Sequence, residues 1–256
     1  MVRTTQPRIE RAKDVLDEEA RVVECERVAF QRFLARIREM GGTSQATVES
    51  NPAGGPAVAT MWESTPSEGL RAVRTAYRET VMAVPHYDRE YGDTLGDSMA
   101  AELGETLAGH VSNGQVLTPR LYDTLCAASE RARDDRGDFL RHLDQERESL
   151  REVGAELNEI ESRLAELARR VDDAPRSTHL GQLDETLAGL ERQCTDLANR
   201  RQATIHGRSV RKIAGLDGAS LLQYLYASRI ETVTPVLSDV AACLETIRHQ
   251  RKRCLR

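Results

Sequence analysis

Residues 139–171 read FLRHLDQERESLREVGAELNEIESRLAELARRV, and this stretch decides the fold class. Its mostly apolar seam recurs with alternating spacings of four and three residues, the repeat by which helices pack in coiled coils. The seam positions are Phe139, Leu143, Glu146, Leu150, Val153, Leu157, Ile160, Leu164, Leu167 and Val171. So long a repeat does not fit a compact globule, and we predict a long helix that packs along a second one.

The same spacing continues backwards from Phe139 through Arg136 to Tyr122. Before it, Thr118-Pro119 is typical of a helix start, because proline fits the first helical turn. After it, residues 172–175 read DDAP and interrupt the pattern. Heptad spacing resumes at Leu180, Leu183, Leu187, Leu190, Cys194 and Leu197, and weakens through Arg201.

The connection between these two heptad segments is short, so they should be antiparallel neighbours. We therefore predict an all-α fold in which a helical body carries a projecting, long antiparallel coiled-coil hairpin over residues 139–207. The body is expected from residues 66–138 and 208–256, the second range ending in a basic tail. Thr65-Pro66-Ser67-Glu68 opens the first range as a capping box.

An amphipathic helix is predicted over residues 1–40, followed by a flexible linker over residues 41–64. Gly41 and Gly42 are expected to end this helix. One side of its seam is apolar throughout, but the other carries Glu19 and Glu26 in the middle. Because these charges interrupt the stripe, we expect the middle to be half-exposed and the helix to dock on its own body or on another chain.

Composition agrees with long helices and bounds the class of protein. Charged residues make up 30% of the chain and aromatic residues 4%, a profile typical of coiled coils. The net charge of −5 is mild, so the chain as a whole does not resemble a nucleic-acid binder. No apolar run is long enough for a membrane span, and we expect no membrane association. The five cysteines form no C-x-x-C pair, which favours reduced thiols in a cytoplasmic protein.

The densest group of reactive side chains is the segment His86, Tyr87, Asp88, Arg89, Glu90 and Tyr91. A loop with one histidine, two carboxylates and two phenols could hold a metal or perform acid–base chemistry. Against this, no Glu-x-x-His pair or other metal-ligand spacing supports it. The favoured interpretation is that the tyrosines fill the body and the charges cap helix ends, with no metal and no cofactor.

Two other features are candidates for binding. Trp62 follows Met61 in an otherwise polar stretch, where the pair could be a docking peptide or could cover the edge of the next helices. Near the C-terminus, Arg248, Arg251, Lys252 and Arg253 could contact phosphates. Cations at a helix C-terminus are also common because they complement its dipole, and a solvated face is the favoured interpretation.

Several stretches are similar to one known family. They are residues 77–87 (YRETVMAVPHY), 99–102 (MAAE), 117–119 (LTP), 224–226 (YLY) and 234–237 (TPVL). They resemble an uncharacterised haloarchaeal helical, coiled-coil family that is classed only as a domain of unknown function. The resemblance runs from the first helix to the C-terminus and implies no activity, ligand or catalytic residue.

These observations favour a non-enzymatic structural or protein-interaction protein that acts through helix–helix contacts, with a protein partner or as a homo-oligomer. Self-association through the glutamate-interrupted first helix is the specific expectation. Two alternatives stay open. One is a nucleic-acid-associated regulatory role of the basic tail, and the other is an enzyme or metal-binding protein centred on the His86 loop.

Overall fold

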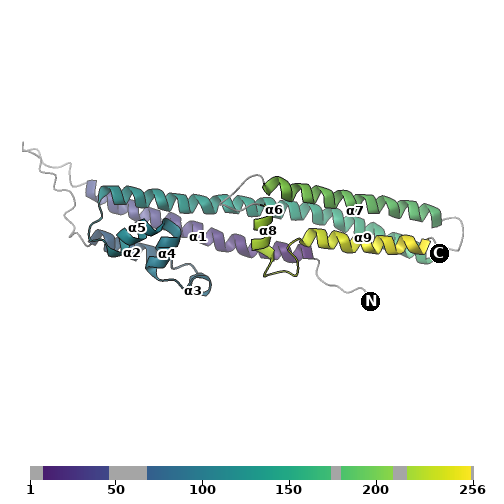
Figure 1. Cartoon of the computed structure of the whole chain (residues 1–256), viewed down its shortest axis with the longest axis horizontal. Coiled ribbons are helices and arrows are strands. Elements are labelled where there is room, and N and C mark those ends of the chain that lie inside the picture. Colours follow the sequence, from purple (N-terminus) through teal and green to yellow (C-terminus); the bar gives the residue numbers. More distant parts are fainter. Residues whose placement is uncertain (1–7, 46–67, 174–179, 210–217, 255–256) are drawn as a thin grey trace, which may run out of the picture. The chain divides into compact units, whose positions relative to one another are not determined.

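A computed structural model describes residues 8–45, 68–173, 180–209 and 218–254. Throughout these ranges the regular structure is α-helical, which confirms the predicted all-α class (Figure 1). The helices are α1 (Arg8–Gln45), α2 (Glu68–Thr80), α3 (Tyr87–Glu90), α4 (Leu95–Leu103), α5 (Glu105–Asn113), α6 (Pro119–Asp173), α7 (Leu180–Ser209), α8 (Gly218–Tyr226) and α9 (Pro235–Cys254).

The chain divides into two compact units. One unit consists of residues 21–140, and the other combines residues 1–20 with residues 141–256. Helices α1 and α6 therefore contribute to both units, since each passes a unit boundary. The five-part division drawn from the sequence stays a prediction.

In the unit of residues 21–140, the core forms where the C-terminal half of α1 meets α2, α4, α5 and the start of α6. Tyr77 of α2 is fully buried, and its ring contacts Phe33 edge-on with centroids 5.1 Å apart. Its hydroxyl lies 3.1 Å from Ser98 Oγ, so the buried phenol keeps a partner. The other members include Phe30, Ile37, Leu70, Val73, Met99, Leu107, Val111 and Leu125. Aromatic and aliphatic side chains from five helices thus share one core.

Helix α1 does not end at Gly41, as the sequence suggested, but continues through Gly41 and Gly42 to Gln45. Gly41 lies against Tyr122 of α6, and a Cβ atom added there would come within 2.4 Å of the Tyr122 hydroxyl oxygen. The absence of a side chain at position 41 therefore makes room for a neighbouring helix. It does not stop α1.

Two short helices, α4 and α5, follow each other almost directly. Gly104 separates them with a backbone φ of +96° and ψ of 145°, a conformation that residues with a side chain rarely adopt. Thr94 caps α4 by accepting a hydrogen bond from the Asp97 N–H. Gly104 thus ends α4 and begins α5, so that the two helices are separate.

In the other unit, the seam residues of α6 and α7 are buried. They include Leu143, Leu150, Leu157, Leu164, Leu183, Leu187, Leu190 and Leu197. Arg201 of α7 bonds Glu146 of α6, while Arg163 of α6 bonds Gln193 of α7, so the two helices run antiparallel. The projecting coiled-coil form of this hairpin stays a prediction. Helix α9 also packs along α7, which gives α7 a second helical neighbour (Figure 1).

The first turn of α1 is held by α9 in the same unit. Asp239 accepts a hydrogen bond from the Ile9 backbone N–H at 3.0 Å and another from Arg8 Nη1 at 3.2 Å. The N–H groups of a first helical turn have no partner within their own helix, and the positive end of the dipole favours a carboxylate. Asp239, which is on α9, supplies both the hydrogen-bond acceptor and the negative charge. Among the described residues, no helix combines the length and the apolar character that crossing a membrane requires.

Two glycines, Gly104 between α4 and α5 and Gly109 within α5, provide a test of the role of backbone conformation at this junction. We expect Gly104→Ala to lower the free energy of unfolding by about 1–2 kcal/mol, because alanine is strained at positive φ. Gly109→Ala, in the middle of α5, should raise it by about 0.5–1 kcal/mol. Neither site has an atom within 4 Å of an added Cβ, so backbone conformation alone separates the two. Urea unfolding followed by circular dichroism measures both, and equal shifts would contradict the assignment.

Candidate functional site

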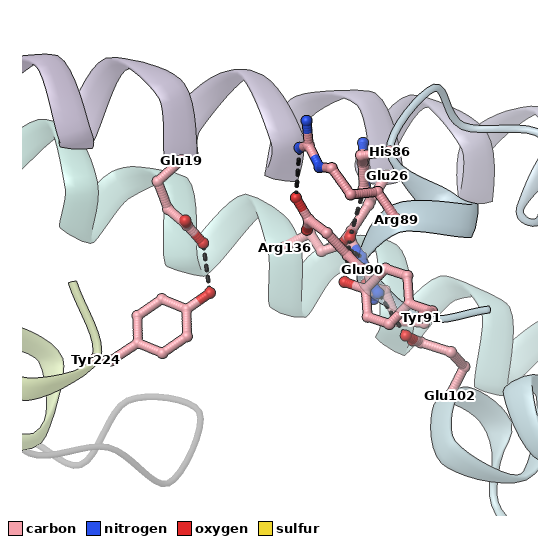
Figure 2. Close-up of polar contacts among 10 residues, drawn as sticks. Glu19, Glu26, His86, Arg89, Glu90, Tyr91, Glu102, Arg136 and Tyr224 are labelled. Carbon is pink, nitrogen blue, oxygen red and sulfur yellow. Dashed lines mark hydrogen bonds and ion pairs between the residues drawn. The ribbon is translucent and has the colours of Figure 1, made fainter. Parts of the chain in front are cut away.

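Glu26 of α1 is the centre of the candidate site in the unit of residues 21–140 (Figure 2). Its side chain is only 12% exposed. Its Oε1 atom lies 3.2 Å from His86 Nε2 and accepts a hydrogen bond from the Tyr91 hydroxyl at 2.7 Å. Its Oε2 atom accepts from Arg136 Nε at 2.8 Å. Three side chains from outside α1 therefore converge on one carboxylate.

Arg136 of α6 connects Glu26 to a second carboxylate. Its Nη2 atom donates to Glu102 Oε1 at 2.7 Å, and its guanidinium lies 4.5 Å from the centre of the Phe30 ring. Burial disfavours the charged form, but the hydrogen bonds and charges of Glu102 and Glu26 outweigh it and raise the pKa of Arg136. The guanidinium is thus a fixed cation between two anions, stacked on an aromatic face.

Tyr91 contributes a proton donor to this group. Burial raises its pKa, and the hydrogen bond to Glu26 and the negative charge of Glu26 raise it further. The phenol therefore keeps its proton and can act as a donor toward Glu26 over the whole physiological pH range. Tyr77, deeper in the same unit, also has a raised pKa because it is buried.

The structure separates the five residues of the predicted His86 loop. His86 and Tyr91 both contact Glu26, and Tyr87 is buried with its hydroxyl 3.5 Å from the Asp93 carbonyl oxygen. Asp88 and Glu90 are exposed on the short helix α3. A role of the loop as a functional site stays a prediction. The candidate site is centred on Glu26, and the loop contributes two of its partners, His86 and Tyr91.

A small pocket of about 70 Å³ lies beside this group. Its lining comprises Glu26, Phe30, Val81, Val84, Tyr87, Tyr91, Asp93, Ser98, Ala101, Glu102 and Arg136. This volume has room for a few water molecules and not for an organic substrate. Within the described ranges, no group of three or more His, Cys, Asp or Glu side chains is arranged to hold a metal ion. The arrangement can fix charges and hold water, and its carboxylate is fully engaged.

The other unit contains two buried carboxylates, Glu19 and Glu146, that also accept hydrogen bonds from arginine and tyrosine side chains. Glu19 of α1 is buried and accepts hydrogen bonds from the Tyr224 hydroxyl at 2.5 Å and from Arg229 Nη1 at 2.8 Å (Figure 2). Glu146 of α6 forms a two-pronged pair with Arg201 of α7, through Nη2–Oε1 at 2.5 Å and Nη1–Oε2 at 3.1 Å. Glu19 is therefore buried and Glu26 is partly buried, and both glutamates have partners within the chain.

Two arginines of the basic C-terminal tail are paired with acidic residues of α7. Arg251 donates from Nε to Asp184 at 2.8 Å and from Nη1 to Glu191 at 2.7 Å, and Arg248 donates to Glu191 at 2.7 Å. These hydrogen bonds lower the pKa of both carboxyls and raise that of Arg251. The other two predicted phosphate contacts, Lys252 and Arg253, are exposed, and Arg253 donates to Gln250. Trp62 lies outside the described residues.

Glu102 and Arg136 were not among the predicted site residues. A signal for Arg136 was present, because it occupies a seam position of the long heptad pattern where an apolar residue is expected. Glu26 interrupts the seam of the first helix in the same way. Two opposite charges at seam positions of two helices are expected to pair when those helices pack together. Glu102, on a short helix without such a pattern, carried no comparable signal.

Comparison with known proteins gives one match. A family described as a domain of unknown function, DUF7260, matches residues 7–251. No curated protein and no solved structure matches the chain. The family description names no group of organisms, so the haloarchaeal origin stays a prediction.

The role of Glu26 can be tested by removing the charge of its side chain while keeping the shape of that side chain. We expect Glu26→Gln to lower the free energy of unfolding by about 1–3 kcal/mol, because a buried guanidinium then loses one of its two anions. Glu24→Gln is the matched control. Glu24 is on the same helix, but its side chain is 47% exposed and pairs with Arg27, so its loss should cost less than about 0.5 kcal/mol. Equal losses in denaturant titrations would contradict a special role for Glu26.

Tyr91 provides a test by pH. Since folding raises its pKa above the ordinary value, the stabilisation from the protonated phenol is fully present below about pH 10 and is lost as pH rises further. We expect the free energy of unfolding to fall between about pH 9.5 and 11.5, and to fall less steeply in Tyr91→Phe. Some slope should remain, because Tyr77 titrates in the same direction. Parallel pH profiles of the two proteins would contradict the hydrogen-bonded donor role.

Proposed function

The chain belongs to the family DUF7260, and we propose that it is a non-enzymatic cytoplasmic protein that acts through helix–helix contacts, with a protein partner or with further copies of itself. The observation that supports this proposal is that the reactive side chains of the candidate site are engaged in contacts within the chain. His86, Tyr91 and Arg136 all bond Glu26, and the adjoining pocket has room for only a few water molecules. An acid–base catalyst needs a group that can reach a substrate. Here these groups fix the packing of helices.

The contact surface that we propose is the exposed face of α7 and of the part of α6 from residue 141 onward, which belong to one unit. Self-association through α1 was expected because Glu19 and Glu26 seemed unpaired, and their pairing within the chain removes that reason. On α6 and α7, charged side chains of both signs are exposed. They include Glu148, Arg151, Glu156 and Arg200. Alternating charges on exposed helix faces select partner helices and their register.

This surface favours a polar, reversible contact over a permanent apolar one. Among the described residues, the exposed large apolar side chains are Tyr91, Val116 and Tyr224, and none of them is on α6 or α7. Interfaces with few apolar anchors depend on charge complementarity, and their association is sensitive to salt. A mixed-charge face suits recognition of another charged helix.

Two other predicted roles receive less support from the contacts. A phosphate group would have to compete with Glu191 and Asp184 for Arg248 and Arg251. An enzyme centred on His86 would need room for a substrate, and the pocket beside Glu26 offers about 70 Å³. Both roles stay predictions.

Charge-swap variants test the proposed surface. In Glu156→Arg/Arg200→Glu, the two helices keep an ion pair but present the opposite charge pattern to a partner; Glu148→Arg/Arg151→Glu does the same within α6. We expect each swap to keep the Tm within about 2 °C and to weaken association at least tenfold, measured by sedimentation velocity and by quantitative recovery of a stoichiometric partner from native cells. The matched control is Arg36→Glu/Glu79→Arg, an exposed pair between α1 and α2, which should leave association unchanged.

Two results would overturn the proposal. The first is a chain that stays monomeric at all concentrations and recovers no stoichiometric partner from its native cells. The second is association that responds equally to the α6–α7 swaps and to the control swap. In that case the α6–α7 face is not the contact surface.

A further inference from the structure

Cys194 of α7 and Cys243 of α9 form a buried thiol pair. Their sulfur atoms lie 3.8 Å apart, and the residues are 49 positions apart in the sequence. Both side chains are buried, and both thiols are free. Since α7 and α9 pack along each other in one unit, this contact is part of a continuous helix–helix interface. The sequence alone placed Cys194 on a seam as a small apolar residue.

The surroundings of the pair suit a neutral sulfur group. The seam residues on either side of it, Leu190 and Leu197 on α7 and Val240 and Ile247 on α9, are buried and apolar. Glu161 of α6 acts on both thiols electrostatically, and its own pKa is raised, first by burial and then by the charge of Asp239. A second thiolate would therefore be costly beside these groups, whereas a disulfide carries no charge.

The two thiols differ in chemical character. The hydrogen bond between them lowers the pKa of Cys194 and raises that of Cys243. The thiolate is the nucleophilic form of cysteine, so Cys194 is the sulfur that reacts first. Cys243 is within contact distance to resolve the product. An attacking thiol with a resolving thiol beside it is the arrangement of redox-active pairs.

We propose that Cys194 and Cys243 are a covalent modification site, at which a peroxide converts them to an intramolecular disulfide that locks α9 onto α7. In the first step the Cys194 thiolate attacks one peroxide oxygen, the O–O bond breaks, and hydroxide leaves as the sulfur becomes a sulfenic acid. In the second step the Cys243 sulfur attacks the Cys194 sulfur, the S–S bond forms as the S–O bond breaks, and the leaving hydroxide takes up the Cys243 proton to become water. Two thiols and one hydrogen peroxide give one disulfide and two waters.

The movement that this reaction needs is small. A disulfide bond is about 2.05 Å long, so the sulfurs must approach by less than about 2 Å from their present contact. Side-chain rotation together with slight adjustment of two packed helices can supply such a shift. The disulfide would also hold Arg248 and Arg251 of α9 beside Glu191 and Asp184 of α7. This proposal does not depend on the proposed function.

The test uses the full chain with the other three cysteines replaced, Cys25→Ser, Cys126→Ala and Cys254→Ala. Treatment with one to ten equivalents of hydrogen peroxide should lower the intact mass by about 2 Da, the mass of the two hydrogens that form one disulfide. It should also remove both thiols detectable after denaturation. The Tm should rise by several degrees, since the bond closes a loop of about 50 residues, and dithiothreitol should reverse the rise. Peptide mapping of the peroxide-treated chain with all five of its cysteines should show Cys194 linked to Cys243.

Matched variants separate this bond from other oxidation. Cys194→Ala and Cys243→Ala in the same background should each abolish the 2 Da loss and the rise in Tm. If either variant fails to fold, peptide mapping of the parent still decides the question. A peptide map without the 194–243 link, with only gains of 16 Da or multiples on single cysteines or with disulfide-linked dimers, would overturn the proposal.

Discussion

The pairing of buried carboxylates with arginines and tyrosines is the constraint on which each unit depends. Glu146 and Arg201 are 0% and 1% exposed, and Glu26 is covered by His86, Tyr91 and Arg136. Moving such a charge out of water costs several kcal/mol, and only a well-placed partner offsets that cost. A pair of this kind adds little net stability compared with apolar residues of equal size. Its loss on one side is expensive, because the remaining charge stays buried and unpaired.

This asymmetry suggests that the buried pairs specify register more than they stabilise. The leucines of α6 and α7 recur at regular spacings, so a shift of one helix by a heptad would still bury apolar side chains against apolar side chains. It would not bring Arg201 to Glu146, whose two hydrogen bonds, with those from Arg201 to Ser149 and from Tyr226 to Glu146, form in one alignment. Polar residues at seam positions commonly fix alignment in this way. Here burial of the hydrophobic seam drives the packing of the helices, and the buried charges fix their register.

The sequence predicted the helices better than it predicted their contacts. The heptad positions of residues 139–171 and 180–197 were recognisable because periodicity is a property of one helix, and their burial follows from it. Glu19 and Glu26 were interpreted as half-exposed interruptions of the seam, because their partners are on other elements, which a one-helix pattern does not specify. Gly41 was also misjudged as the end of a helix, because the side chain that it accommodates, Tyr122, is on another helix.

The difference between buried and exposed ion pairs also determines how ionic strength acts on this protein. Glu148 with Arg151 and Glu156 with Arg200 face water, where salt at physiological strength screens charges beyond about 8 Å. Glu146 with Arg201 lies where little solvent or salt can enter, so its attraction persists. Salt would therefore weaken contacts made through the proposed face of α6 and α7, while the pairs that align the helices stay intact. The proposed association and the internal alignment of the unit would thus depend on separate sets of charges, and one could change without the other.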